Sequence, residues 1–89
     1  MEIIRSASAG TMESSDAYVE IEPRESGIRI ELESVVQAQF GETIRNAVRE
    51  TLEDQGVENA SVRVIDRGAL ECVIRARVEA AVGRGRGQK

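Results

Sequence analysis

Two adjacent serines, Ser14 and Ser15, are the side chains of this sequence with the clearest potential for chemistry. They lie in the segment AGTMESSD (residues 9–16), which is small and polar and has no regular apolar period. The sequence contains no histidine, so a Ser-His-Asp triad is excluded and neither hydroxyl has a histidine base. Two interpretations remain. The hydroxyls bond nearby backbone in an ordinary turn, or one of them accepts a bulky group from an enzyme that supplies the base and the electrophile.

The other reactive side chains do not form a self-sufficient active site. Cys72 is the single cysteine, which excludes an internal disulfide and a thiolate zinc cluster. Its place in an alternating apolar segment predicts a buried structural thiol. The acidic pairs Glu20 with Glu22 and Glu31 with Glu33 stand at strand spacing, which predicts a solvated sheet face. We therefore expect a protein with no catalytic residues and no metal ion of its own.

The composition predicts one small domain in a reducing compartment. The 89 residues are 40% hydrophobic and 31% charged, and Tyr18 and Phe40 are the aromatic residues. The net charge is −4, because residues 1–33 carry eight acidic and three basic side chains and outweigh the basic last third. This acidity argues against nucleic acid as the partner. Since no apolar stretch approaches the ~20 residues of a membrane span and no signal-peptide layout is present, we expect no membrane partner and a cytoplasmic location.

Apolar periodicity predicts two strands followed by a helix. Apolar and charged residues alternate over residues 18–22 and 28–33, and the short turn-rich link at residues 23–27 predicts a hairpin. Apolar residues then recur at every fourth position over residues 36–52, which is typical of one helix face. These residues are Val36, Phe40, Ile44, Val48 and Leu52.

The last third of the sequence fits two patterns. Residues 62–64 predict a strand, and every second residue from Leu70 to Ala80 is apolar, which predicts a strand paired back through a turn at residues 66–68. A helix over the same residues is the alternative, but it would place Arg77 inside its apolar face. We favour the second hairpin, with Arg75 and Arg77 pairing with acids on its outer face.

Together these elements predict a two-layer α+β sandwich of hairpin–helix–hairpin order (ββαββ), with one helix on a four-stranded antiparallel sheet. The domain is expected to span residues 1–82, with a loop at residues 6–17 and a flexible basic tail at residues 83–89. Alternation into the first strand turns Ser14 outward and Ser15 inward. The predicted sheet core consists of Val19, Ile21, Ile28, Ile30, Leu32, Val62, Val64, Leu70, Ile74 and Val78.

Three blocks of the sequence resemble the acyl carrier protein of citrate lyase, its gamma subunit. The blocks are AGTMESSD (residues 9–16), QFGE with IR (residues 39–42 and 44–45) and DRGALECVIRARVEA (residues 66–80), and the resemblance runs along essentially the whole chain. In that family the serine directly after the glutamate carries a covalent prosthetic group, which implies Ser14 as the attachment residue. The group is 2'-(5''-phosphoribosyl)-3'-dephospho-CoA, a phosphopantetheine-like arm joined through a phosphodiester.

The resemblance also implies a division of labour in citrate fermentation. The carrier, without catalytic activity of its own, holds acetyl and citryl thioesters on its arm. The alpha subunit exchanges acetyl for citryl and releases acetate, and the beta subunit cleaves the citryl thioester to oxaloacetate. The implied partners are these two subunits, the transferase (holo-carrier synthase) that attaches the group and the ligase that acetylates it. Two alternatives stay open: a carrier of malonate decarboxylase, and an unmodified protein-interaction module that uses its sheet face.

Overall fold

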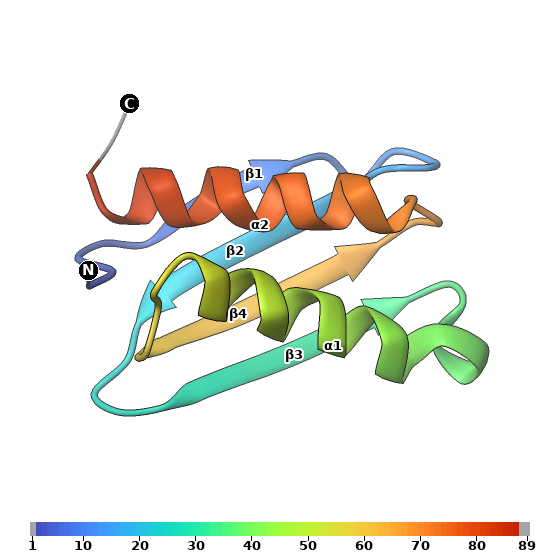
Figure 1. Cartoon of the computed structure of the whole chain (residues 1–89). Helices are drawn as coiled ribbons and strands as arrows, with labels where there is room; N and C mark the ends of the chain where they lie inside the picture. Colours follow the sequence, from blue (N-terminus) through green and yellow to red (C-terminus); the bar gives the residue numbers. More distant parts are fainter. Residues whose placement is uncertain (1, 88–89) are drawn as a thin grey trace.

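A sheet with helices on one of its faces makes up the computed structural model, which describes residues 2–87, with Gln37 by its backbone alone (Figure 1). Over those residues the elements run in the order βββαβα. Their bounds are β1 (Ala7–Gly10), β2 (Ala17–Pro23), β3 (Ile28–Ser34), α1 (Gln37–Asp54), β4 (Ala60–Asp66) and α2 (Glu71–Gly85). The predicted α+β class with two layers and a four-stranded sheet is confirmed for this part of the chain, but the ββαββ order with one helix is wrong.

The strand order across the sheet is β1-β2-β4-β3, with β4 between β2 and β3. Strands β1 and β2 pair antiparallel, β2 and β4 pair antiparallel, and β3 and β4 pair parallel. The predicted hairpin between residues 18–22 and 28–33 is therefore wrong. The link at residues 24–27 passes the start of β4, because Pro23 and Ile28 both pair with Ala60. It crosses two strand spacings, or roughly 10 Å, a distance that a short extended segment spans. A parallel pair needs a crossover connection, and α1 provides it between β3 and β4.

Residues 71–85 form α2, so the strand predicted at residues 70–80 is wrong. The buried face of α2 recurs at helical spacing and consists of Ile74, Val78, Ala81, Val82 and Gly85. This buried face is rotated about the helix axis from the apolar face considered in the sequence analysis. Arg77 therefore lies beside the buried face and not within it. The predicted cross-strand pairs are also wrong, because Arg75 bonds Glu71 one turn earlier (Nε to Oε2, 3.2 Å) and Glu50 of α1 (Nη2 to Oε1, 2.8 Å).

The flexible tail predicted at residues 83–89 begins too early. Residues 83–85 continue α2. Gly85 packs against the N-terminal segment and β2 so closely that a β-carbon at this position would stand 3.1 Å from Ile3 and 3.3 Å from Ile21. The backbone carbonyl of Gly85 also accepts a hydrogen bond from the amide of Ile4 at 2.9 Å. Residues 88–89 of the predicted tail lie outside the described residues.

The core lies between the sheet and the α1–α2 layer, and most of the predicted core residues are buried there. Val19, Ile21, Val62 and Val64 of the sheet are no more than 1% exposed. The β3 residues of the predicted core are only partly buried, and Leu70 is 71% exposed, because it ends the loop before α2. The predicted α1 face is buried from Ile44 through Val48 to Leu52, whereas Phe40 is 51% exposed.

Replacing Val82 by alanine is expected to lower the free energy of unfolding by about 2 kcal/mol, because two buried methyl groups are lost from the inner face of α2. Glu79→Ala, on the exposed side of the same helix, is expected to change it by less than about 0.5 kcal/mol. Urea denaturation of both variants measures the difference. Equal effects would contradict the packing of α2 on the sheet.

Candidate functional site

Ser14 and Ser15 form the tip of a turn between β1 and β2. The amide of Asp16 donates a hydrogen bond to the carbonyl of Glu13 at 3.1 Å and closes a four-residue turn. Ser15 is the third residue of this turn and has the left-handed φ of +65° that a type II turn has there. Both serines are exposed, so the prediction that Ser15 turns inward is wrong. The loop is also shorter than predicted, because residues 7–10 of the expected loop form β1 and leave residues 11–16 as the turn segment. We call residues 11–16 the serine turn.

The serine turn is fixed to the segment that follows β4. The amide of Ser15 donates to the carbonyl of Arg67 at 2.8 Å, and the amide of Arg67 donates to the carbonyl of Asp16 at 2.9 Å. These two bonds continue the β2–β4 ladder beyond its last strand pair, Ala17 with Asp66. The turn is therefore held at its second serine by its neighbour in the sheet, while Ser14 stays outside this pairing.

An ion pair with α2 holds the other side of the turn. Arg77 donates from Nε to Asp16 Oδ1 at 3.0 Å and from Nη2 to Oδ2 at 2.9 Å, a bidentate arrangement. The same carboxylate accepts a hydrogen bond from the Thr11 hydroxyl at 2.7 Å and one from the amide of Ala17 at 2.7 Å. The hydrogen bonds from Arg77, which have the largest effect, and those from Thr11 and Ala17 hold the pKa of Asp16 well below its usual range. Asp16 therefore also fixes the local backbone, through its bond to the amide of Ala17.

Gly10 allows Arg77 to reach the turn. A β-carbon at Gly10, whose φ is +92°, would stand 1.9 Å from the carbonyl oxygen of Ala17 and 3.0 Å from Cδ of Arg77. Only glycine accepts both the backbone conformation and this close approach. Arg77 and Gly10 were not identified from the sequence as site residues. The signal for Arg77 was available, since it is the charged residue that interrupts an otherwise apolar helical pattern.

Asp66 organises the loop against which the serine turn rests. Its carboxylate is 1% exposed, and Oδ1 accepts hydrogen bonds from the amides of Gly68 at 3.2 Å and Ala69 at 2.9 Å. Oδ2 accepts a hydrogen bond from the hydroxyl of Ser34, at the end of β3, at 2.8 Å. A buried carboxylate with three donors is satisfied and fixes the path of residues 66–69.

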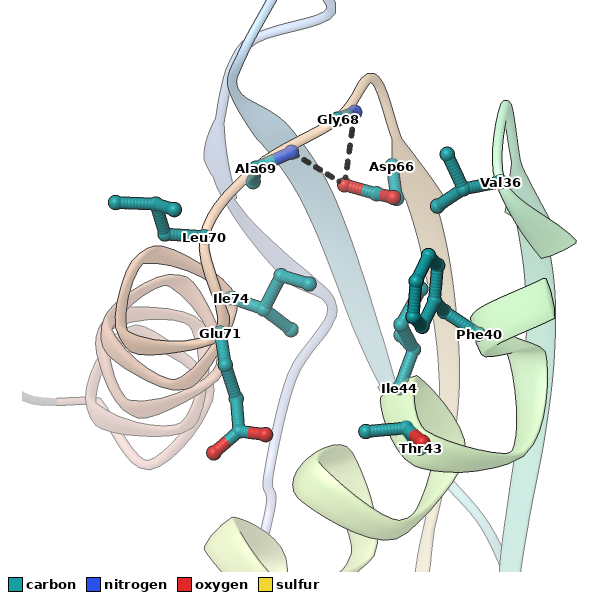
Figure 2. A pocket seen from close by; sticks show the side chains of 10 residues that line it. All are labelled: Val36, Phe40, Thr43, Ile44, Asp66, Gly68, Ala69, Leu70, Glu71 and Ile74. Carbon is teal, nitrogen blue, oxygen red and sulfur yellow. Dashed lines mark hydrogen bonds between the residues drawn. The ribbon is translucent and has the colours of Figure 1, made fainter.

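A pocket of about 330 Å³ opens beside this loop, between the first turns of α1 and α2. Figure 2 shows Phe40 and Ile44 of α1 on one side and Ile74 of α2 on the other, with Asp66, Gly68 and Ala69 above them. Its remaining lining residues are Val36, Thr43, Leu70 and Glu71. The pocket and the serine turn thus share the loop after β4, at one end of the molecule.

The chemistry of this end is that of an acceptor rather than of a catalyst. The Ser14 hydroxyl is exposed, the neighbouring Asp16 is neutralised by Arg77, and the exposed side chain of Arg67 adds positive charge beside the turn. These features fit a phosphate-linked group on Ser14, because a phosphodiester carries a negative charge that Arg67 can pair with.

Cys72 is exposed, so its predicted burial is wrong.

Within residues 2–87, no cluster of three His, Cys, Asp or Glu side chains is placed to hold a metal ion. The same part of the chain contains no helix that is long and apolar enough to cross a membrane.

Comparisons with known proteins point to acyl carriers. The sequence profile of the acyl carrier family described as "Malonate decarboxylase delta subunit (MdcD)" matches residues 4–85. The citrate lyase acyl carrier protein of Escherichia fergusonii is 60% identical over 85 residues, which cover 94% of this chain and 88% of that protein. The protein of the same name from Halothermothrix orenii is 49% identical over 84 residues, and this match covers 94% of this chain and 89% of that protein.

A solved structure shares the fold. One chain of a Pseudomonas malonate decarboxylase hetero-tetramer in complex with malonate superposes on this protein with a TM-score of 0.82. The match covers 96% of this protein and 88% of the malonate decarboxylase chain, at 21% sequence identity. At this identity the likeness establishes the fold and leaves the choice of substrate to other evidence.

Asp16→Asn is expected to destabilise the protein at neutral pH, because the ion pair with Arg77 is lost. The carboxyl has a folded-state pKa below its unfolded value, so its stabilising effect is present above about pH 4 and declines as the pH falls below it. Urea unfolding of the wild type and the variant from pH 7 to pH 2.5 measures this. The difference in stability should narrow below about pH 4, and a constant difference would contradict the role of the carboxylate charge.

Proposed function

Because this chain belongs to the family of citrate lyase acyl carrier proteins, we propose that Ser14 carries the family's prosthetic group, 2'-(5''-phosphoribosyl)-3'-dephospho-CoA. The observation that carries the assignment is the geometry of the serine turn. Ser14 is exposed at its tip and outside the backbone pairing, whereas the amide of Ser15 is bonded to Arg67. An exposed hydroxyl is the feature that a modifying enzyme needs in its substrate.

The attachment replaces the proton of the Ser14 hydroxyl by a phosphoryl linkage. The oxygen of Ser14 bonds to phosphorus of the activated precursor, its proton passes to a base of the transferase, and the precursor's leaving group departs with its electron pair. The protein offers no histidine for this proton, so the base belongs to the transferase. We expect the exposed side chain of Arg67, whose backbone bonds Ser15 and Asp16, to pair with the new phosphodiester. Asp16 does not repel it as a free carboxylate would, because Arg77 neutralises its charge.

The attached group supplies a terminal thiol that holds acetyl or citryl as a thioester. The carrier brings this thioester to the alpha subunit, which exchanges acetyl for citryl and releases acetate, and to the beta subunit, which releases oxaloacetate. Tethering raises the effective concentration of the thioester at each active site to the millimolar range, as for other short linkers. The ligase that acetylates the thiol completes the set of proposed partners, and all of them are cytoplasmic in this proposal.

A malonate decarboxylase carrier is the second candidate. Its support is the family description that names malonate decarboxylase and the fold shared with a subunit of that complex. The citrate assignment is favoured because identity to citrate lyase carriers reaches 60%, against 21% to the malonate decarboxylase chain. Adding purified alpha and beta subunits of citrate lyase to the modified carrier separates the two, since only the citrate carrier restores citrate cleavage.

Ser14→Ala is expected to abolish attachment, and Ser15→Ala is expected to retain it. Ser15 serves the turn through its backbone amide, which alanine also provides, and both residues adopt the left-handed φ of +65° at a similar cost because both carry a β-carbon. Each variant is incubated with the transferase and the activated precursor, and the intact mass of the product is measured.

Ser15→Gly is the matched control, because glycine accepts a positive φ without strain. Circular dichroism first establishes that each variant is folded. Attachment that persists in Ser14→Ala and disappears in Ser15→Gly would overturn the assignment of the serine.

A further inference from the structure

We propose that the pocket between α1 and α2 binds the adenine ring of the arm attached to Ser14. This inference rests on the proposed function, because the arm supplies the adenine. The pocket opens between Phe40 and Ile44 on α1 and Ile74 on α2, and these side chains face one another across it (Figure 2). At about 330 Å³ it lies at the lower end of the range of small-molecule sites, a size that suits one flat heterocycle.

Phe40 is the side chain that indicates the kind of ligand. It is the single phenylalanine of the chain and is 51% exposed, although it continues the apolar face whose next members, Ile44 and Val48, are buried. Purine bases stack on aromatic rings, and an exposed ring at the side of a pocket offers such a platform. On the opposite side Leu70 is 71% exposed and lines the same pocket, so it offers an apolar surface to a bound base, while the buried Ile74 forms part of the pocket floor.

Polar groups stand at the rim of the pocket, where the edge of a base would lie. Thr43 carries a hydroxyl and Glu71 a carboxylate there (Figure 2). Glu71 Oε2 accepts a hydrogen bond from Arg75 Nε at 3.2 Å, which holds the carboxylate in place. A carboxylate and a hydroxyl are acceptors for the exocyclic amine of adenine. An apolar interior with a few acceptors at its rim is the usual design of such sites.

The position of the pocket selects adenine over the pantetheine end of the arm. The loop after β4 contributes Gly68 and Ala69 to the pocket, and the preceding residue, Arg67, is bonded to Ser15 and Asp16 of the serine turn. In the arm, a single phosphoribosyl unit separates the serine from the adenosine, so the base is the aromatic part nearest the attachment point. Binding the base leaves the pantetheine and its thioester free to enter the active sites of the partners.

Titration of the unmodified carrier with free dephospho-CoA tests the proposal, with 4'-phosphopantetheine as the matched probe that lacks the adenosine. Nuclear magnetic resonance follows the Phe40 ring and the Ile44 and Ile74 methyl groups. Dephospho-CoA is expected to shift all three, and 4'-phosphopantetheine to leave them in place. Phe40→Ala is expected to raise the Kd for dephospho-CoA at least about tenfold.

Ile4→Ala is the control variant, because Ile4 is a 66% exposed apolar residue near the far end of α2, where its amide bonds Gly85, and its Kd should match that of the wild type. Equal shifts with 4'-phosphopantetheine would assign the pocket to the pantetheine section and overturn the proposal. So would the absence of shifts at millimolar dephospho-CoA, or an unchanged Kd in a folded Phe40→Ala variant.

The modified protein gives a second readout. Nuclear Overhauser contacts from adenine H2 or H8 to the Ile44 and Ile74 methyl groups are expected once the arm is attached, and their absence would contradict the proposal. The titration uses free dephospho-CoA and needs no attachment, so its outcome is independent of Ser14. Loss of attachment in the mass measurement, by contrast, concerns the proposed function and leaves the titration standing.

Discussion

The buried carboxylate of Asp66 is the contact on which the arrangement of the functional end depends. It accepts hydrogen bonds from the amides of Gly68 and Ala69 and from the hydroxyl of Ser34, and so ties the end of β3 to the loop that leads into α2. Breaking such a network leaves buried donors unpaired, at a cost of about 1–3 kcal/mol for each. The same loop carries Arg67, whose backbone holds the serine turn, and borders the pocket. One buried acid therefore positions both the proposed attachment residue and the proposed adenine site.

The sheet order explains why these parts meet at one end of the molecule. Strand β4 runs antiparallel to β2 and parallel to β3, so the end of β4 adjoins the start of β2 and the end of β3. The serine turn precedes β2, α1 follows β3, and α2 follows β4. The connections after β3 and β4 start both helices at this end (Figure 1). The serine turn is thereby placed on the sheet scaffold while Ser14 stays exposed, which suits the proposed attachment of a prosthetic group there.

Local patterns predicted those parts of the structure that depend on local physics. Alternation located β2, β3 and β4, the four-residue period located α1, and the small polar segment located the turn that carries Ser14 and Ser15. The errors concern contacts between distant residues. Arg77 interrupted the apolar face considered for a helix over residues 70–80, whereas in the structure it lies beside the buried face of α2 and bonds Asp16, 61 positions earlier. Strand β1 escaped notice because its small residues carry no strand pattern, and β4 enters between β2 and β3 from later in the sequence.

The most direct test of the account is the covalent state of the chain in its own host. The protein is isolated from cells grown anaerobically on citrate and digested with trypsin, which releases the peptide of residues 6–24 between Arg5 and Arg24. Tandem mass spectrometry then locates any added group among its serines and its threonine. The account predicts one phosphoribosyl-dephospho-CoA group on Ser14. A peptide that is unmodified throughout the preparation, or one that carries the group on another residue, would contradict it.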